Sequence, residues 1–134
     1  MTLPPPQILP RVPELFRLLE ERSLRYCLAS NNATLTIESV QARLTSIGVQ
    51  VRPEALVTSA HAAAGYVRRH YRQPPRVLVI GEEGLRQALV EAGCTLVDTA
   101  EGAAVVVVGM DRGLTWPKLV EAGLAIAGGA TFIG

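Results

Sequence analysis

The 134-residue chain has few aromatic residues and almost no cysteine. Aromatic residues make up 4% of the sequence, so any core has to be built from Val, Leu, Ile and Ala. The two cysteines, Cys27 and Cys94, both lie in apolar stretches, which predicts two buried thiols rather than a disulfide. Free thiols fit a reducing, cytoplasmic compartment.

The chain also lacks an excess of either charge and any long apolar run. It has 13 basic and 12 acidic residues, which leaves no basic footprint for nucleic acid. The longest apolar run, residues 103–108, is too short to cross a bilayer. Pro4-Pro5-Pro6 stands where a signal peptide would have its apolar segment. We therefore expect a cytoplasmic protein that binds neither nucleic acid nor membranes.

What the chain does have is 49% apolar residues in a regular pattern. Continuous apolar strands alternate with amphipathic helices, which predicts an α/β fold with a parallel sheet covered on both faces. We expect helices at 13–21, 36–47, 60–71, 85–92 and 115–127, and strands at 25–29, 76–80, 95–97, 103–108 and 130–133. Thr36, Ser59 and Thr115 are the expected helix caps. Gln73-Pro74-Pro75 is the clearest break, and it predicts two lobes, 1–73 and 74–134.

The main candidate site is the loop Ser30-Asn31-Asn32, which follows the expected buried strand 25–29. Ligands of open α/β sheets bind at the carboxyl ends of strands. A hydroxyl and two amides beside free backbone N–H groups suit an anion such as phosphate. An ordinary turn is the alternative, because Ser and Asn form turns through their own side chains.

Three further segments carry polar residues that chemistry would use. Asp111 and Arg112 follow the strand at 103–108, where they suit either contact with a substrate or an exposed ion pair. Gly81-Glu82-Glu83-Gly84 is expected to be a plain turn, since two carboxylates would repel a pyrophosphate. His61 and His70 are spaced wrongly for a shared metal ion. Trp116 is expected to be a packing anchor.

Several of these segments together resemble the haloacid dehalogenase-like hydrolase superfamily, in its NagD-type branch of 4-nitrophenylphosphatases, phosphoglycolate phosphatases and pyridoxal phosphatases. Residues 29–32, Ala-Ser-Asn-Asn, resemble the family's second motif, in which Thr-Asn-Asn is usual. Residues 79–85 resemble the start of its inserted cap, and residues 107–112 resemble the cap's substrate-facing loop. The resemblance runs from about residue 9 to residue 134.

The resemblance implies an incomplete Rossmann-like core of three αβα layers, followed by most of an α/β cap. It implies a Mg²⁺-dependent hydrolase that acts on small phosphorylated metabolites through an aspartyl-phosphate. Ser30, Asn31 and Asn32 would bind the transferred phosphoryl group. Asp111 and Arg112 would face the substrate from the cap and select the leaving group.

The chain lacks the motifs that carry out catalysis in this family. The family's first motif, an Asp-x-Asp-Gly strand, is expected just before Leu9, where Met1–Pro6 contains no Asp. No segment matches the family's lysine or its acidic Mg²⁺ ligands. We therefore expect no catalytic residue and no metal ligand in this chain, and a truncated phosphatase that is inactive by itself.

Two other functions stay open. A non-catalytic binding protein on the same fold would expose unpaired strand edges, which favour self-association or a partner that supplies the missing half. An unrelated nucleotide-binding protein using Gly81–Gly84 is the weaker alternative.

Overall fold

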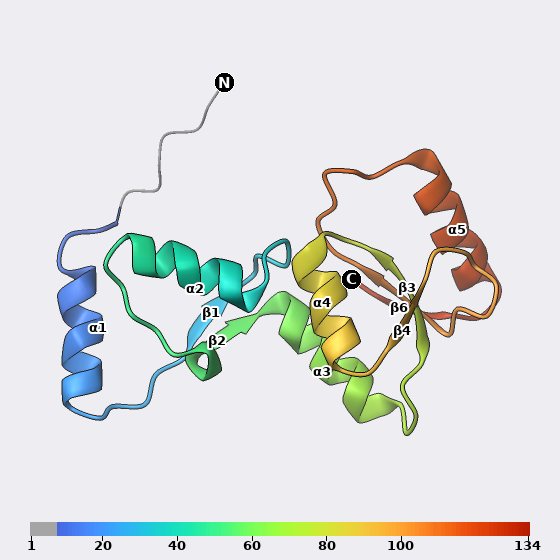
Figure 1. Cartoon of the computed structure of the whole chain (residues 1–134). Helices are drawn as coiled ribbons and strands as arrows, with labels where there is room; N and C mark the ends of the chain where they lie inside the picture. Colours follow the sequence, from blue (N-terminus) through green and yellow to red (C-terminus); the bar gives the residue numbers. More distant parts are fainter. Residues whose placement is uncertain (1–7) are drawn as a thin grey trace.

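The computed structural model describes residues 8–134 and has an α/β fold of two lobes (Figure 1). The first lobe contains α1 (Val12–Glu21), β1 (Leu28–Ser30), α2 (Ile37–Ser46), the 3₁₀ helix η1 (Pro53–Ala55) and β2 (Leu56–Thr58). The second contains α3 (Ser59–His70), β3 (Arg76–Ile80), α4 (Glu83–Glu91), β4 (Thr95–Val97), β5 (Val105–Val108), α5 (Trp116–Ala127) and β6 (Thr131–Ile133). The expected lack of a nucleophile motif before Leu9 concerns residues that lie outside this described part.

The first lobe is built on a small parallel sheet. Strands β1 and β2 pair in parallel, with Leu28 opposite Leu56 and Ser30 opposite Thr58. One face of this pair packs on a cluster around Val49 and Leu56, to which α1 and α2 contribute apolar side chains. The pairing matters for function because it sets the carboxyl ends of β1 and β2 side by side.

The strand expected at residues 25–29 is shorter, later and more exposed than its apolar sequence indicates. It runs from Leu28 to Ser30, and none of its residues is fully buried. Cys27 is exposed, so the prediction of two buried thiols was wrong for this residue. The reason is that β1 has a single neighbouring strand within residues 8–134 and is covered on one face only. Cys94 is buried as expected, and burial raises the pKa of its thiol.

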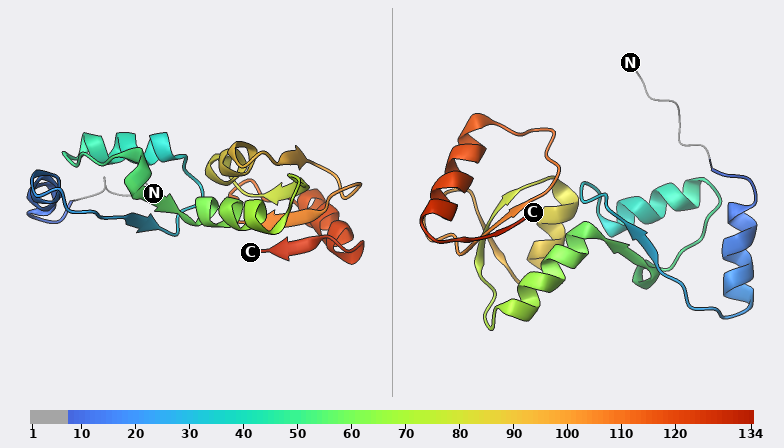
Figure 2. Two further views of the ribbon diagram at one scale, coloured as in Figure 1. Left: turned by 90° about the horizontal axis from the view of Figure 1, so that it is seen from below. Right: turned by 180° about the vertical axis from the view of Figure 1, so that it is seen from behind.

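The second lobe is a four-stranded sheet in the order β4-β3-β5-β6. All of its strand pairs are parallel, as the sequence pattern predicted. Val77 lies opposite both Leu96 of β4 and Val105 of β5, and Val106 lies opposite Phe132 of β6. Helices α3 and α4 cover one face and α5 covers the other (Figure 2). No helix between residues 8 and 134 has the length and apolar character to cross a bilayer.

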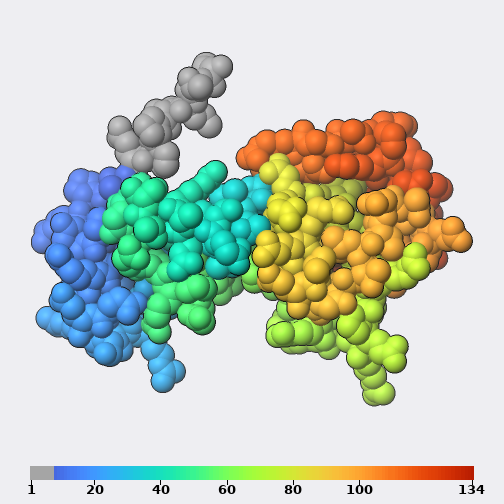
Figure 3. Space-filling model, in the orientation of Figure 1, coloured from blue at the N-terminus to red at the C-terminus, as the bar shows by residue number. Residues whose placement is uncertain are grey.

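Helix α3 joins the lobes. It begins directly after β2, yet its buried residues Ala60, Ala64 and Val67 belong to the core formed with β3, β5 and α4. The lobe boundary that the sequence indicates at residues 73–74 stays a prediction. Helix α3 precedes that boundary in the sequence, yet it packs on the sheet that follows the boundary. In the space-filling view the two lobes meet where the cyan segment after β1 abuts the yellow α4 (Figure 3).

Side chains cap the amino ends of α2 and α3, but one cap and the environment of Trp116 differ from expectation. Thr36 caps α2 by accepting from the Ser39 backbone N–H, as predicted. The cap of α3 is Thr58 rather than Ser59, because Thr58 has extended backbone angles and accepts from the His61 N–H. Trp116 is 76% exposed, so it is not the packing anchor that the sequence suggested.

Candidate functional site

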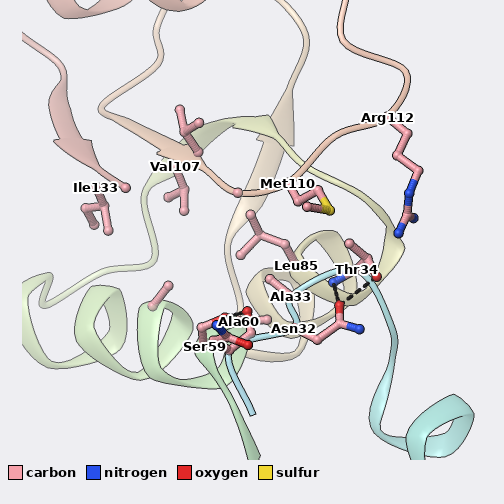
Figure 4. Close-up of a pocket in the computed structure, with 15 residues that line it drawn as sticks. Asn32, Ala33, Thr34, Ser59, Ala60, Leu85, Val107, Met110, Arg112 and Ile133 are labelled. Carbon is pink, nitrogen blue, oxygen red and sulfur yellow. Dashed lines mark hydrogen bonds between the residues drawn. The ribbon is translucent and has the colours of Figure 1, made fainter. Parts of the chain in front are cut away.

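A cavity of about 560 Å³ lies between the lobes, where the carboxyl ends of β1, β2 and β5 come together. Asn32, Ser59 and Ala60 line it from one side, and Met110 and Arg112 reach it from the other (Figure 4). Its remaining wall is largely apolar and includes side chains of α4 and β5. The cavity therefore combines a polar rim with an apolar interior, as small-molecule sites commonly do.

The loop after β1 is held in a fixed shape by its own side chains. The Ser30 hydroxyl oxygen accepts a hydrogen bond from the Asn32 backbone N–H at 3.1 Å. The Asn32 side-chain oxygen accepts from both the backbone N–H and the hydroxyl of Thr34, at 2.9 and 2.7 Å. This is the side-chain turn expected of Asn. It leaves the Asn32 amide N–H₂ and the Ser30 hydroxyl hydrogen available to donate.

The second lobe supports this loop from behind through α4. The Thr34 carbonyl accepts from the Gly84 backbone N–H at 3.2 Å, in the first turn of α4. A Cβ on Gly84 would overlap the Leu35 carbonyl oxygen and come within 2.8 Å of the Ala33 carbonyl oxygen. Only glycine permits this close approach. The loop is thus wedged between its own strand and a helix of the other lobe.

Helix α3 contributes the second polar edge of the cavity. Ser59, its first residue, lies at the end of β2 and donates from its hydroxyl to the Asn31 carbonyl at 3.0 Å. Because β1 and β2 are parallel neighbours, their ends present Asn31 and Ser59 to the same space. The amino end of the 12-residue α3 also opens there, and its dipole favours a bound anion.

Arg112 brings a positive charge to the opposite rim. Its Nη1 donates to both carboxylate oxygens of Glu82, at 3.0 and 2.9 Å, and its backbone N–H donates to Glu82 at 3.1 Å. Within residues 8–134 its Nε and Nη2 make no hydrogen bond, and the side chain is largely exposed. The carboxylate thus orients the guanidinium while leaving donors for an anion in the cavity.

Asp111 faces away from the cavity. Its carboxylate accepts from Lys118 Nζ at 2.6 Å and from the Gly113 backbone N–H at 2.8 Å, and the side chain is 6% exposed. The hydrogen bond from Lys118 is the main cause that holds the pKa of Asp111 below its usual value. Asp111 therefore fixes the fold of the loop that carries Arg112.

The structure thus brings together three of the five predicted site residues. Asn31, Asn32 and Arg112 line the cavity, whereas Ser30 supports the loop from within and Asp111 anchors its own loop. Sequence reasoning missed Thr34, Ser59 and Glu82. The end of the apolar segment 55–57 was the available signal for Ser59, since neighbouring parallel strands end at the same edge. Glu82 gave no signal, because its partner Arg112 is 30 residues away.

The residues around the cavity do not fit a magnesium ion. Mg²⁺ prefers carboxylate oxygens, and no Asp or Glu side chain is among the described residues that line the cavity. Residues 8–134 also contain no group of three His, Cys, Asp or Glu side chains placed to hold a metal.

Comparison with known proteins gives this cavity a context. Residues 5–95 match the haloacid dehalogenase-like hydrolase family. The 5'-nucleotidase YutF of Bacillus subtilis is 38% identical over 120 residues, which cover 90% of this chain and 46% of that protein. The chain spans about half the length of the curated relatives that it matches.

Solved structures agree with the sequence match. A hypothetical protein from Pyrococcus horikoshii superposes with a TM-score of 0.89 at 36% identity, over 94% of this chain and 51% of the other. A glycerol phosphate phosphatase from Mycobacterium tuberculosis, solved in complex with magnesium, superposes with a TM-score of 0.77 at 31% identity, over 86% of this chain and 35% of the other. A match over most of the sequence, together with a shared fold, shows that the chain belongs to the haloacid dehalogenase-like hydrolase family.

Proposed function

We propose that the chain supplies the phosphate-binding loop and the leaving-group side of a phosphomonoester hydrolase that acts on small phosphorylated metabolites. The observation that carries this proposal is the cavity that Asn31, Asn32 and Arg112 line at the junction of the lobes, with Asn32 and Arg112 on opposite sides (Figure 4). Relatives of the chain are named as phosphatases and a nucleotidase, which supports the same class of substrate.

The available donors suit a phosphoryl group. The Asn32 amide and the amino end of α3 lie on one side of the cavity, and the guanidinium N–H groups of Arg112 that Glu82 does not use lie on the other. Hydrogen bonds from such donors to a charged phosphate are stronger than hydrogen bonds between neutral groups. The apolar wall, to which Leu85 and Met110 contribute, suits the carbon skeleton of the leaving group.

The same cavity lacks an aspartate, the residue that would attack phosphorus in the mechanism that the family resemblance implies. The only aspartates of the chain are Asp98 and Asp111, and neither lines it. Asp111 is also held by Lys118. The family implies Mg²⁺, yet the lining residues do not fit that ion, so we derive no step through it. We propose that this chain binds phosphate esters without hydrolysing them by itself.

Titration of the full chain with 4-nitrophenyl phosphate and with inorganic phosphate, followed by calorimetry or by NMR, tests the proposal. Asn32→Ala and Arg112→Gln each remove a hydrogen bond to a charged ligand, which is worth about 1.5–3 kcal/mol, so we expect affinity to fall about tenfold or more. Arg17→Gln is the matched control, because Arg17 is an exposed arginine on α1, far from the cavity.

Equal affinity in the Arg112→Gln and Arg17→Gln variants, or no binding by the native chain, would contradict the assignment. A hydrolysis assay with and without Mg²⁺ addresses the second half of the proposal. Turnover that disappears in Asn32→Ala would show a nucleophile that the cavity does not reveal, and would overturn the claim of binding without hydrolysis.

A further inference from the structure

Thr34 lines the candidate phosphate site, yet its hydroxyl has no hydrogen left with which to bind a ligand. It is 6% exposed and is among the residues around the cavity. Its hydroxyl and its backbone N–H both donate to the Asn32 side-chain oxygen, at 2.7 and 2.9 Å (Figure 4). A hydroxyl has one hydrogen to donate, so this one serves the loop and not an anion in the cavity.

The two donors of Thr34 decide which end of the Asn32 amide is available to a ligand. A side-chain amide has an oxygen that accepts and an N–H₂ that donates, and half a turn about its last bond exchanges them. A backbone N–H can only donate, so the Asn32 oxygen has to face Thr34. Within residues 8–134 the Asn32 N–H₂ makes no hydrogen bond, and Asn32 lines the cavity. The amide is therefore held with its donor end free for an anion.

Burial makes the two residues depend on each other. The Thr34 carbonyl accepts from the Gly84 backbone N–H at 3.2 Å, which ties this residue to the first turn of α4. Its buried hydroxyl has the Asn32 oxygen as its acceptor, and a buried donor that loses its acceptor is costly. Turning the amide over would leave that hydroxyl and the backbone N–H of Thr34 facing donors instead of an acceptor. The orientation of the amide is thus fixed by the fold and not by a ligand.

We propose, on the basis of the phosphate binding proposed above, that Thr34 is a positioning residue of this site. It acts on a bound oxyanion through the orientation of the Asn32 amide, and not through a contact of its own. A phosphate ester dianion accepts hydrogen bonds at its oxygens, so it gains from an amide that presents its N–H₂ before the ligand arrives. Holding a binding group in its bound orientation raises affinity because less ordering remains to be done on binding.

A double-mutant cycle in the full chain tests how Thr34 acts, with inorganic phosphate as the probe and NMR titration as the measurement. Thr34→Val removes the hydroxyl and keeps the branched shape, and we expect phosphate affinity to fall about threefold or more. In an Asn32→Ala background the same substitution should leave the affinity unchanged, because no amide is left to orient. Thr34→Ser keeps the hydroxyl and should bind phosphate within about twofold of the native chain. Thr95→Val is the matched control, since Thr95 lies on β4 and does not line the cavity.

Urea unfolding without ligand tests the same pair independently of binding. Thr34→Val and Asn32→Ala should together destabilise the chain by less than the sum of their separate effects, because each one alone leaves a partner unpaired. Asn32→Asp keeps the test valid if Thr34→Val folds poorly. It retains an oxygen that accepts from Thr34 but replaces the N–H₂ with a second oxygen. We expect Asn32→Asp to keep the native urea midpoint and to bind phosphate about tenfold more weakly or worse.

The outcomes separate the role of Thr34 from the proposed function. If the native chain binds phosphate, an equal loss from Thr34→Val in both backgrounds would overturn the role of Thr34 alone. Native affinity in Thr34→Val or in Asn32→Asp would do the same, and so would a loss in Thr34→Ser as large as that in Thr34→Val. Additive effects on stability would overturn it whether or not the chain binds phosphate. No binding by the native chain would contradict the proposed function and, with it, the role of Thr34 in binding.

Discussion

Asp111 and Arg112 are neighbours in sequence, but their side chains point in different directions and have different partners. Arg112 lies at the rim of the cavity and pairs with Glu82, whereas Asp111 pairs with Lys118 in the first turn of α5. Removing the Asp111 carboxylate would therefore loosen the loop rather than remove a contact with a ligand. We expect the loss of the Asp111–Lys118 ion pair to lower the stability of the folded chain and to change how that stability depends on pH.

We predict that Asp111→Asn lowers the thermal midpoint at neutral pH and that the difference from the native chain vanishes in acid. The pKa of Asp111 is below its ordinary value of 3.8 in the folded chain. Its stabilising contribution is thus complete above the unfolded value and is lost as pH falls through the folded one. Thermal melts between neutral pH and the acid limit of folding check this. A difference that grows on acidification would contradict it.

At the scale of elements, the contact between the first turn of α4 and the loop at residues 33–35 holds the binding loop in place. It consists of a hydrogen bond from Gly84 to the Thr34 carbonyl and an approach that leaves no room for a side chain. Thr34 in turn fixes the Asn32 side chain. The shape of the loop that we propose binds phosphate therefore depends on a helix of the other lobe.

We predict that Gly84→Ala destabilises the chain and weakens phosphate binding, although Gly84 touches no ligand. Overpacking against rigid backbone costs about 1–3 kcal/mol, and alanine's better helix propensity does not offset it. Gly123→Ala is the control, since a Cβ there meets open space and should be neutral or stabilising. Urea unfolding and phosphate titration of both variants provide the measurement. Equal behaviour of the two would show that the contact does not constrain the loop.

At the scale of the whole molecule, α3 links the two sheets. Its first residue contacts Asn31 beside the small sheet, and its buried face belongs to the core of the large one. Just beyond its last residue, the Tyr71 hydroxyl donates to the Thr131 hydroxyl in β6. An isolated pair of strands is marginally stable, so we expect the first lobe to open more readily than the second.

We predict that limited proteolysis of the full chain leaves a resistant fragment that still contains α3. Cleavage should fall in the connections of the first lobe, and the amides of β3 and β5 should exchange most slowly, because they lie at the centre of the large sheet. Mass spectrometry of the fragments and hydrogen exchange are the measurements. A resistant fragment that begins near residue 74 would instead favour the division into 1–73 and 74–134.

Most of the second lobe could be predicted from local pattern, because strands such as 76–80 are continuous apolar runs bounded by turn residues and buried on both faces. The first lobe was harder. Cys27 and Leu28 look like a buried strand, but burial depends on how many strands lie alongside, which no local pattern encodes. The prediction for Trp116 was wrong for a related reason. The sequence of an apolar helix does not reveal which of its sides packs on the sheet.

The candidate site was predictable where it depended on strand ends and not where it depended on long-range pairing. Asn31 and Asn32 follow a strand directly, so their position at a sheet edge could be expected. The ion pair between Glu82 and Arg112 joins two loops of the second lobe that are 30 residues apart in sequence. Only the three-dimensional arrangement of the strands brings these loops together. The wedge of Gly84 against residues 33–35 likewise follows from how α3 sets one lobe against the other.

The strand order of the second lobe has a consequence for synthesis on the ribosome. Strand β3 emerges first, β4 then adds to one of its edges and β5 to the other, and β6 adds to the outer edge of β5. Every new strand meets an edge that is already present and still open, so no earlier pair has to separate to admit a later one. The sheet can therefore grow in step with translation, outward from its own centre.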